Sequence, residues 1–166
     1  MTRKTAILIV SLVTVVFTLA LSSLAAAPAP KKLKVKLNYT GAGTVDEQHK
    51  IYVLLFDADP FVSPKIEDAS SAATQPAAAE GVCHIIRRQS ASSKNGTIAF
   101  DDLTTSPVYA AAFFDKNASY NPQTFMIEGA PMGVYGKEAN KAEAIKLAEG
   151  KPTEIALAFD DSIKAP

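Results

Sequence analysis

The chain has 166 residues with 17 basic and 17 acidic side chains, so its formal net charge is zero. This balance gives no reason to expect nucleic acid or anionic membranes as partners. Cys83 is the single cysteine, so an internal disulfide is excluded and stability must come from the hydrophobic core.

Residues 1–25 have the layout of a secretory signal peptide. Arg3 and Lys4 precede an apolar stretch from Ala6 to Leu21, and small residues follow it. An uncleaved membrane anchor is the alternative, because the stretch lies near the lower limit of about 17–25 residues for a span. We therefore expect an exported protein, periplasmic or extracellular. Residues 26–32 read as a proline-alanine spacer, and residues 33–161 as one domain.

The first strands follow from apolar periodicity. Residues 33–39 alternate apolar and polar side chains, which is typical of a half-buried strand. Residues 50–56 are apolar on both faces, which predicts a strand in the middle of its sheet. Residues 82–88 and 97–103 form two further predicted strands. Asn95-Gly96 between them is a strong hairpin signal.

The later part of the chain contains one further central strand and an ambiguous end. Residues 108–115 are apolar on both faces. Apolar residues alternate over 145–147 and again over 155–159, which predicts a closing hairpin. A helix over 137–149 is the rival interpretation, since alanine, lysine and glutamate favour helices. Residues 58–80, rich in alanine, serine and proline, show no apolar period and are expected to be irregular.

About seven short strands separated by turns predict an all-β protein, a single Ig-like or prealbumin-like β-sandwich. The sequence "VYAAAFFDKNASYNPQ…GAPMGVYG…EAIKLAEGKPTEIALAFDD", together with "KIYVLLFD", resembles a family of small exported bacterial proteins of unknown function. That resemblance implies a prealbumin-like or carboxypeptidase-regulatory-like sandwich. It implies no activity. The family's acidic loop is dense in Asp, Asn and Gly, whereas this chain has Ala118 and no glycine there.

Acidic residues follow both predicted central strands. Asp57 and Asp59 come after one, and Asp115 and Asn117 come after the other. Calcium takes about six to eight oxygen ligands, and the four side chains could share an ion if the two strands run in the same direction. The alternative is that they only form turns, since Asp and Asn bond their own backbone.

The sequence contains few of the residue patterns that are typical of catalytic sites. His84 and Cys83 are adjacent, so a strand points them to opposite faces and they cannot form a dyad. His49 is the only other histidine. A hydrolase would need a pocket that joins one of these histidines to a carboxylate, and no nucleophile motif provides one. We expect no catalytic residues and no cofactor apart from the calcium alternative.

A cluster of aromatic and methionine residues lies in the long segment after Asp115. Such side chains outside strands can form a contact surface for a protein or a glycan. The alternative is that they fold back and close one end of the sandwich. The predicted partner surface comprises Tyr120, Phe125, Met126, Met132 and Tyr135.

The sequence thus favours a non-catalytic exported β-sandwich that acts as a binding or interaction module for an unknown protein or glycan. A calcium-stabilised version of the same domain is the alternative. A hydrolase is the remote third hypothesis.

Overall fold

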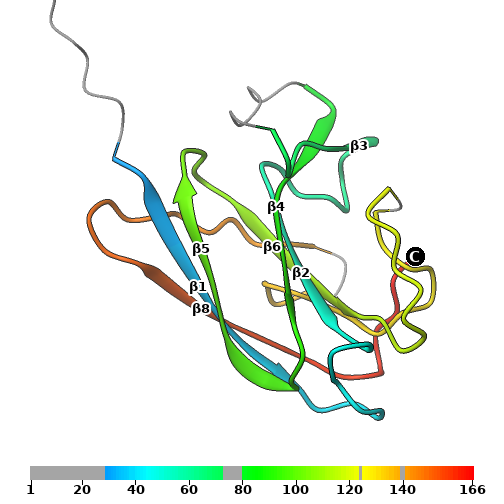
Figure 1. Cartoon of the computed structure of the whole chain (residues 1–166). Helices are drawn as coiled ribbons and strands as arrows, with labels where there is room; N and C mark the ends of the chain where they lie inside the picture. Colours follow the sequence, from blue (N-terminus) through cyan, green and yellow to red (C-terminus); the bar gives the residue numbers. More distant parts are fainter. Residues whose placement is uncertain (1–28, 73–79, 124, 139–140) are drawn as a thin grey trace, which may run out of the picture.

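The computed structural model describes residues 29–72, 80–123, 125–138 and 141–166 (Figure 1). Within these residues the protein is all-β, with strands in two sheets and no helix. This confirms the prediction of an all-β protein. The strands are β1 (Lys31–Tyr39), β2 (Ile51–Phe56), β3 (Lys65–Asp68), β4 (Val82–Ala91), β5 (Asn95–Leu103), β6 (Tyr109–Phe114), β7 (Met132–Val134) and β8 (Thr153–Phe159).

The smaller sheet has the order β5-β1-β8, and the larger one has the order β3-β4-β2-β6-β7. β1 is antiparallel to β5 and parallel to β8. In the larger sheet β3 is parallel to β4, and the other neighbours are antiparallel. β2 and β6 therefore lie inside the larger sheet, as their two-faced apolar pattern predicts.

The two sheets face each other across a shared core. The alternation of β1 is confirmed, since its apolar residues, Leu33 to Tyr39 at every second position, are buried. They meet Val53 and Leu55 of β2 and Ala112 of β6 in one cluster. Lys32, Lys34 and Lys36 of β1 face outward, and they pair with Asp101 and Glu154 on the neighbouring strands.

A second apolar cluster covers the outer face of the larger sheet. Leu54, Phe56, Ala111 and Phe113 are buried there, on the face opposite the shared core. They are covered by side chains from residues 115–131, which we call the covering loop. The described part of this loop runs beside β2 and β6 in Figure 1.

The predicted hairpin at Asn95-Gly96 is wrong. β4 and β5 are consecutive, but they belong to different sheets. Both residues lie within β5, where Gly96 is the partner of Leu37 on β1. The short connection from β4 to β5 is therefore a corner between sheets, and a turn signal alone does not distinguish the two arrangements.

The predicted closing hairpin is also wrong, and so is its rival, the helix over 137–149, in the described residues of that range. Ile145 forms an isolated bridge with Val108 instead of pairing with β8. β8 pairs in parallel with β1. The alternation of Ile145 and Leu147 does mark buried positions, because both side chains join the shared core.

Two strands were not predicted. β3 lies within residues 58–80, which were expected to be irregular, and it borders the larger sheet beside β4. β7 lies in the long segment that was expected to be a loop. Both strands are short, three or four residues, so neither contains enough alternation to be recognised. β1 also begins at Lys31, two residues inside the predicted spacer.

The signal segment, residues 1–25, lies outside the described residues, and so do residues 26–28 of the spacer. In the part of the chain that the structure describes, no helix has the length and apolar character needed to cross a membrane.

Gly133 of β7 sets how closely the two sheets approach, because a Cβ atom there would overlap Cβ of Phe159 on β8. We predict that Gly133→Ala lowers the free energy of unfolding by about 1–3 kcal/mol, the usual cost of overpacking a core. Urea unfolding measures this effect.

Gly96→Ala is the matched control. A Cβ atom at Gly96 meets only the Ser93 hydroxyl at 3.6 Å, an ordinary contact. Equal unfolding free energies for the two variants would contradict the close approach of the sheets at Gly133.

Candidate functional site

The two acidic pairs lie at opposite ends of the larger sheet. β2 and β6 are antiparallel, with Ile51 opposite Phe114 and Phe56 opposite Tyr109. Asp57 and Asp59 therefore follow one end of the pair, and Asp115 and Asn117 follow the other. The condition for a shared calcium ion, strands in the same direction, is not met. Across the described residues, no group of three or more His, Cys, Asp or Glu side chains is placed to hold a metal.

Asp115 organises the start of the covering loop. Its side chain is buried, and its carboxylate accepts hydrogen bonds from three backbone N–H groups. These donors are Asn117 at 3.2 Å, Ser119 at 3.1 Å and Tyr120 at 2.8 Å. The turn-forming alternative therefore describes what Asp115 does in the structure.

Arg88 and Tyr120 fasten the covering loop to the outer face of the sheet. The Tyr120 ring packs on the rings of Tyr52 and Phe113, with centroids 4.2 and 5.0 Å away. Arg88 of β4 lies over the Tyr120 ring and donates to Asp68 of β3 at 3.0 Å. Its guanidinium also donates to the carbonyl of Pro122, at 3.2 Å. One arginine therefore joins β3, β4 and the covering loop.

The predicted partner surface is divided by the fold. Met132 lies in β7 and is only 1% exposed, so its assignment to an exposed surface is wrong. Tyr135 packs against the shared core, and Tyr120 packs on the sheet as described. Phe125 and Met126 remain partly exposed and line a surface groove. Four of the five side chains are partly exposed, and of these only Phe125 and Met126 line the groove.

This apolar groove has a volume of about 590 Å³. One wall comes from the segment after β2 and from β3, and the other comes from the covering loop and the C-terminal segment. Val62, at 72% exposure, lies next to the first wall. Its lining residues are Pro60, Phe61, Ile66, Phe125, Met126, Lys164 and Pro166.

A carboxylate network holds the C-terminal wall of the groove. The Asp161 carboxylate accepts from the Tyr39 hydroxyl at 2.7 Å and from the Ala42 N–H at 2.8 Å. It also pairs with Lys116 at 2.9 Å. Beyond Asp161 the backbone pairs with residues 129–132, through bonds such as Ala165 N–H to the Ala130 carbonyl at 2.8 Å. This pairing brings Lys164 and Pro166 to the groove.

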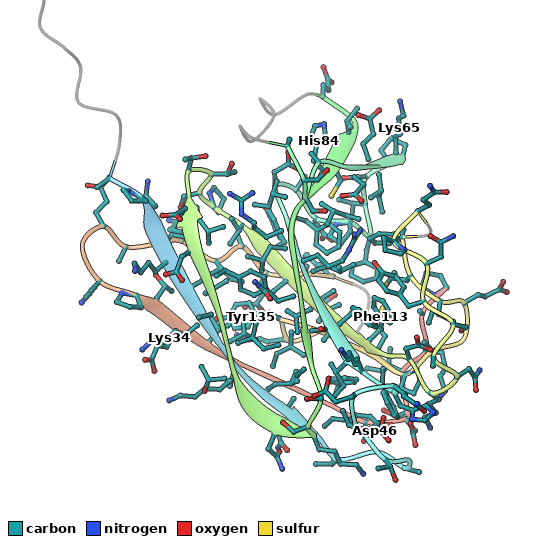
Figure 2. The ribbon with its side chains drawn as sticks, viewed as in Figure 1. Lys34, Asp46, Lys65, His84, Phe113 and Tyr135 are labelled. Carbon is teal, nitrogen blue, oxygen red and sulfur yellow. The ribbon has the colours of Figure 1, made fainter. Side chains whose placement is uncertain are left out.

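A second buried cluster, around His84, lies beside the first wall of the groove, which comes from the segment after β2 and from β3. His84 is 7% exposed, and its Nδ1 is 2.6 Å from Oδ2 of Asp57. Oδ1 of Asp57 also accepts the backbone N–H of His84 at 2.7 Å. The opposite ring nitrogen, Nε2, is 3.7 Å from Oε2 of Glu67 on β3. Figure 2 shows His84 near Lys65 at the β3 end of the molecule, far from Asp46.

Both histidines contact a carboxylate, which the hydrolase hypothesis requires. His49 is 2.9 Å from Asp46 and lines an open pocket of about 510 Å³. Asp46 also accepts the backbone N–H of His49, which makes the contact part of a turn. Two candidate nucleophiles, Ser63 and Cys83, donate their hydrogen bonds to backbone carbonyls. Ser63 Oγ donates to the Asp59 carbonyl at 2.8 Å, and Cys83 Sγ donates to the Ala58 carbonyl at 3.3 Å.

Cys83 lies on the outer face of β4 among apolar side chains. Burial raises the pKa of its thiol to about 12, so the thiolate is scarce at neutral pH. Cys83 therefore behaves as a small buried apolar residue, and it gives no support to a nucleophilic mechanism.

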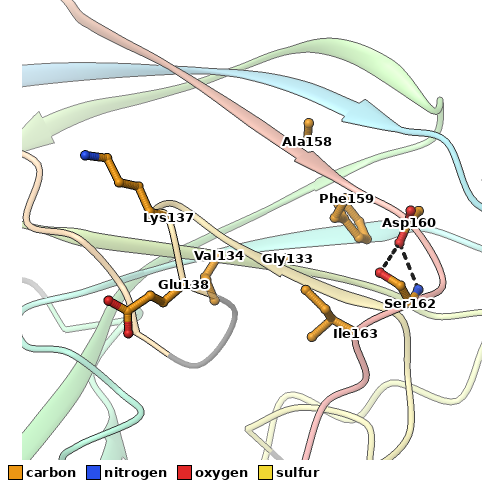
Figure 3. A pocket seen from close by; sticks show the side chains of 10 residues that line it. Gly133, Val134, Lys137, Glu138, Ala158, Phe159, Asp160, Ser162 and Ile163 are labelled. Atoms are coloured by element: carbon orange, nitrogen blue, oxygen red, sulfur yellow. Dashed lines mark hydrogen bonds between the residues drawn. The ribbon is translucent and has the colours of Figure 1, made fainter.

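A smaller pocket of about 250 Å³ lies between β7 and the end of β8 (Figure 3). Asp160 faces it, but its Oδ1 accepts both the N–H and the hydroxyl of Ser162, at 2.8 and 2.5 Å. Phe159 and Gly133 contribute the close contact between the sheets. The lining of this pocket is more polar than that of the groove, since it includes Lys137, Glu138, Asp160 and Ser162.

Sequence reasoning identified none of the individual residues of the first wall of the groove. Pro60, Phe61 and Ile66 lie in the segment that was read as irregular, and Lys164 lies beyond the last predicted strand. The apolar triplet "PFV", Pro60 to Val62, inside an otherwise alanine- and serine-rich segment was the available signal.

No protein-family model, curated protein or solved structure matches this chain.

We predict that Asp115→Ala lowers the free energy of unfolding by about 2–4 kcal/mol, because three backbone N–H groups lose a charged acceptor. Thermal unfolding should show this loss equally in chelator and in millimolar calcium. A rise of several degrees with calcium in the unaltered chain, lost in the variant, would instead make Asp115 a metal ligand.

A second prediction concerns acid stability. Lys116, Tyr39 and the Ala42 N–H hold the pKa of Asp161 well below its usual range. Because this pKa is depressed on folding, its stabilising contribution is complete above about pH 4 and falls as the pH drops further. We expect Asp161→Asn to lower the melting temperature at pH 7 and the deficit to shrink at pH 2.5.

Asp101→Asn is the control, since Asp101 pairs with Lys32 at an exposed site, where ion pairs contribute little. A deficit for Asp161→Asn that is the same at both pH values would show that the pKa of Asp161 is not depressed.

Proposed function

We propose that this chain is an exported, non-catalytic β-sandwich of Ig-like or prealbumin-like type that binds an extended segment of another protein in the apolar groove. Export is supported by the signal-like layout of residues 1–25. The sandwich is supported by two sheets that enclose a common core. The groove is the observation that carries the binding role.

The groove differs chemically from the other faces of the molecule. Its lining includes two phenylalanines, an isoleucine and a methionine, and apolar concave surfaces of this kind are where ligands bind. The outer face of the smaller sheet instead presents paired charges, such as Lys36 with Glu154 at 3.2 Å. A partner therefore gains most from apolar burial in the groove.

The lining favours a peptide over a glycan. Sugar recognition needs many polar groups around an aromatic platform, and among the described residues that line the groove Lys164 alone is charged. Lys164 is weakly paired, because its ammonium is 4.0 Å from an Asp161 oxygen that Lys116 contacts at 2.9 Å. We therefore propose a partner segment with apolar side chains next to an acidic residue or a terminal carboxylate.

The absence of a catalytic role is supported by the state of the candidate nucleophiles. Cys83 and Ser63 both donate to backbone carbonyls, and the Cys83 thiol is strongly disfavoured as a thiolate. We infer instead that His84, together with Asp57 and Glu67, has a structural role beside the first wall of the groove.

Selection of random peptides displayed on phage against the purified chain tests this function. We expect enriched peptides to share an apolar core next to an acidic residue. Phe61→Ser should reduce their affinity about tenfold or more, because a partly buried aromatic anchor in a groove is a typical hot spot.

Val62→Ser is the matched control, since Val62 adjoins Phe61 but does not line the groove. It should leave the affinity within about twofold. Absence of a shared peptide motif, or equal binding by the Phe61→Ser variant, would overturn the proposal. Binding to an array of glycans in place of peptides would also overturn it.

A further inference from the structure

β8 forms one edge of the smaller sheet, and β1 is its only strand neighbour (Figure 1). The Phe159 carbonyl accepts the Thr40 N–H at 3.0 Å, so the backbone groups of Phe159 face β1. Because the direction of these groups alternates along a strand, those of Glu154, Ala156 and Ala158 point away from the sheet. In the part of the chain that the structure describes, no backbone group bonds to them on that side.

The other edges of the two sheets are protected. β5 ends in a β-bulge, where Asp102 has a φ of 54° and its carbonyl accepts the Arg87 guanidinium at 3.4 Å. β7 is paired on its outer side by the C-terminal segment, whose Ile163 carbonyl accepts the Met132 N–H at 3.0 Å. β3 has four residues, of which three are charged. Bulges, charges and covering segments all hinder the addition of another strand.

The edge of β8 lacks these features. Its register with β1 is continuous from Thr153 to Phe159, so no bulge interrupts it. The small side chains of Ala156 and Ala158 lie on its exposed face. Glu154 is the charged residue of this strand, and Lys34 and Lys36 of β1 already pair with it. A further strand can therefore add to β8 without meeting a bulky side chain or an unpaired charge.

The charges at the two ends of β8 indicate which strand fits. Exposed Lys151 lies just before the strand, and exposed Asp160 lies just after it. When two copies of β8 run antiparallel, the basic start of each lies beside the acidic end of the other. The edge is thus complementary in charge to a second copy of itself.

We propose that a second copy of this chain pairs antiparallel along β8, about a two-fold axis at Ala156. In this register Ala156 lies opposite Ala156 of the second copy, and Glu154 lies opposite its Ala158, so no like charges face each other. Three residues of each strand then exchange about six N–H···O bonds. The two three-stranded sheets become one sheet of six strands. No residue of β8 lines the apolar groove, so this inference does not depend on the proposed function.

Sedimentation velocity of the purified chain over a range of concentrations tests the association. We expect a monomer–dimer equilibrium with a dissociation constant of about 1–100 µM, since one short strand buries less surface than a standard interface. A chain that remains monomeric at millimolar concentration would overturn the inference.

Ala156→Pro removes an N–H group that has no partner within the sheet, so the bonds to β1 remain. It should raise the dissociation constant of the dimer at least about tenfold, because two bonds at the axis are lost. Ala99→Pro is the matched control. Ala99 is an exposed alanine of β5, and its backbone groups also point away from β1. It should leave the constant within about twofold. Equal constants for the two variants would contradict pairing along β8.

Lys151→Glu tests the charge complementarity without changing the strand. The substitution places an acidic side chain beside Asp160 of the second copy. It should weaken the dimer about three- to tenfold, because an exposed ion pair is lost at both ends of the interface. An unchanged dissociation constant would exclude the antiparallel arrangement about Ala156.

A disulfide reports the register directly. Opposed residues of a hydrogen-bonded antiparallel pair have Cα atoms about 5.5 Å apart, within the range of about 4.4–6.8 Å for a disulfide. Under mild oxidation Ala156→Cys should therefore form a covalent dimer, whereas Ala99→Cys should not. The native Cys83 is buried and does not interfere. Equal crosslinking of the two variants would show collision in place of pairing and would overturn the proposal.

Discussion

The outer face of the larger sheet is apolar, and the rest of the structure depends on how that face is covered. β2, β4 and β6 carry buried side chains on both faces of the larger sheet. The smaller sheet covers only the inner face. An uncovered outer face would leave Leu54, Phe56 and Phe113 in water, at a cost of about 1.5–3 kcal/mol for each side chain. The chain meets this constraint with a loop in place of a third layer of regular structure.

Polar side chains hold the covering loop in one arrangement on the outer face of the larger sheet. Asp115 fixes the beginning of the loop through three backbone N–H groups, and Arg88 fixes its middle to β3 and β4. The C-terminal segment, held through Asp161, pairs with the end of the loop. The apolar groove lies where this cover meets the segment after β2. The groove is thus a consequence of covering a sheet with loops from two sides.

Local pattern was sufficient to predict the long strands. The alternating pattern of β1 identifies it as a strand from sequence alone. β2 and β6 are apolar on both faces, so the sequence also predicts their central position in a sheet. Pairing was harder to predict, because it depends on long-range contacts. The turn-like Asn95-Gly96 and the alternation near Ile145 gave no information about which sheet their neighbours join.

The candidate site was predictable in part. Phe125 and Met126 were identified by their chemistry, whereas Met132 and Tyr135 have the same chemistry and are used in packing. Only the fold separates these roles. The acidic residues after β2 and β6 were recognised, but their separation depends on the antiparallel pairing of those strands. The other wall of the groove comes from a segment with too little periodicity to interpret.

The central claim is that the groove is the surface on which a partner binds. Titration of the isotope-labelled chain with a selected peptide, followed by NMR, tests this most directly. If the groove is the binding surface, the largest chemical-shift changes fall on Phe61, Ile66 and Met126. Changes concentrated instead on the outward-facing residues of β1, β5 and β8 would place the partner on the smaller sheet and contradict it.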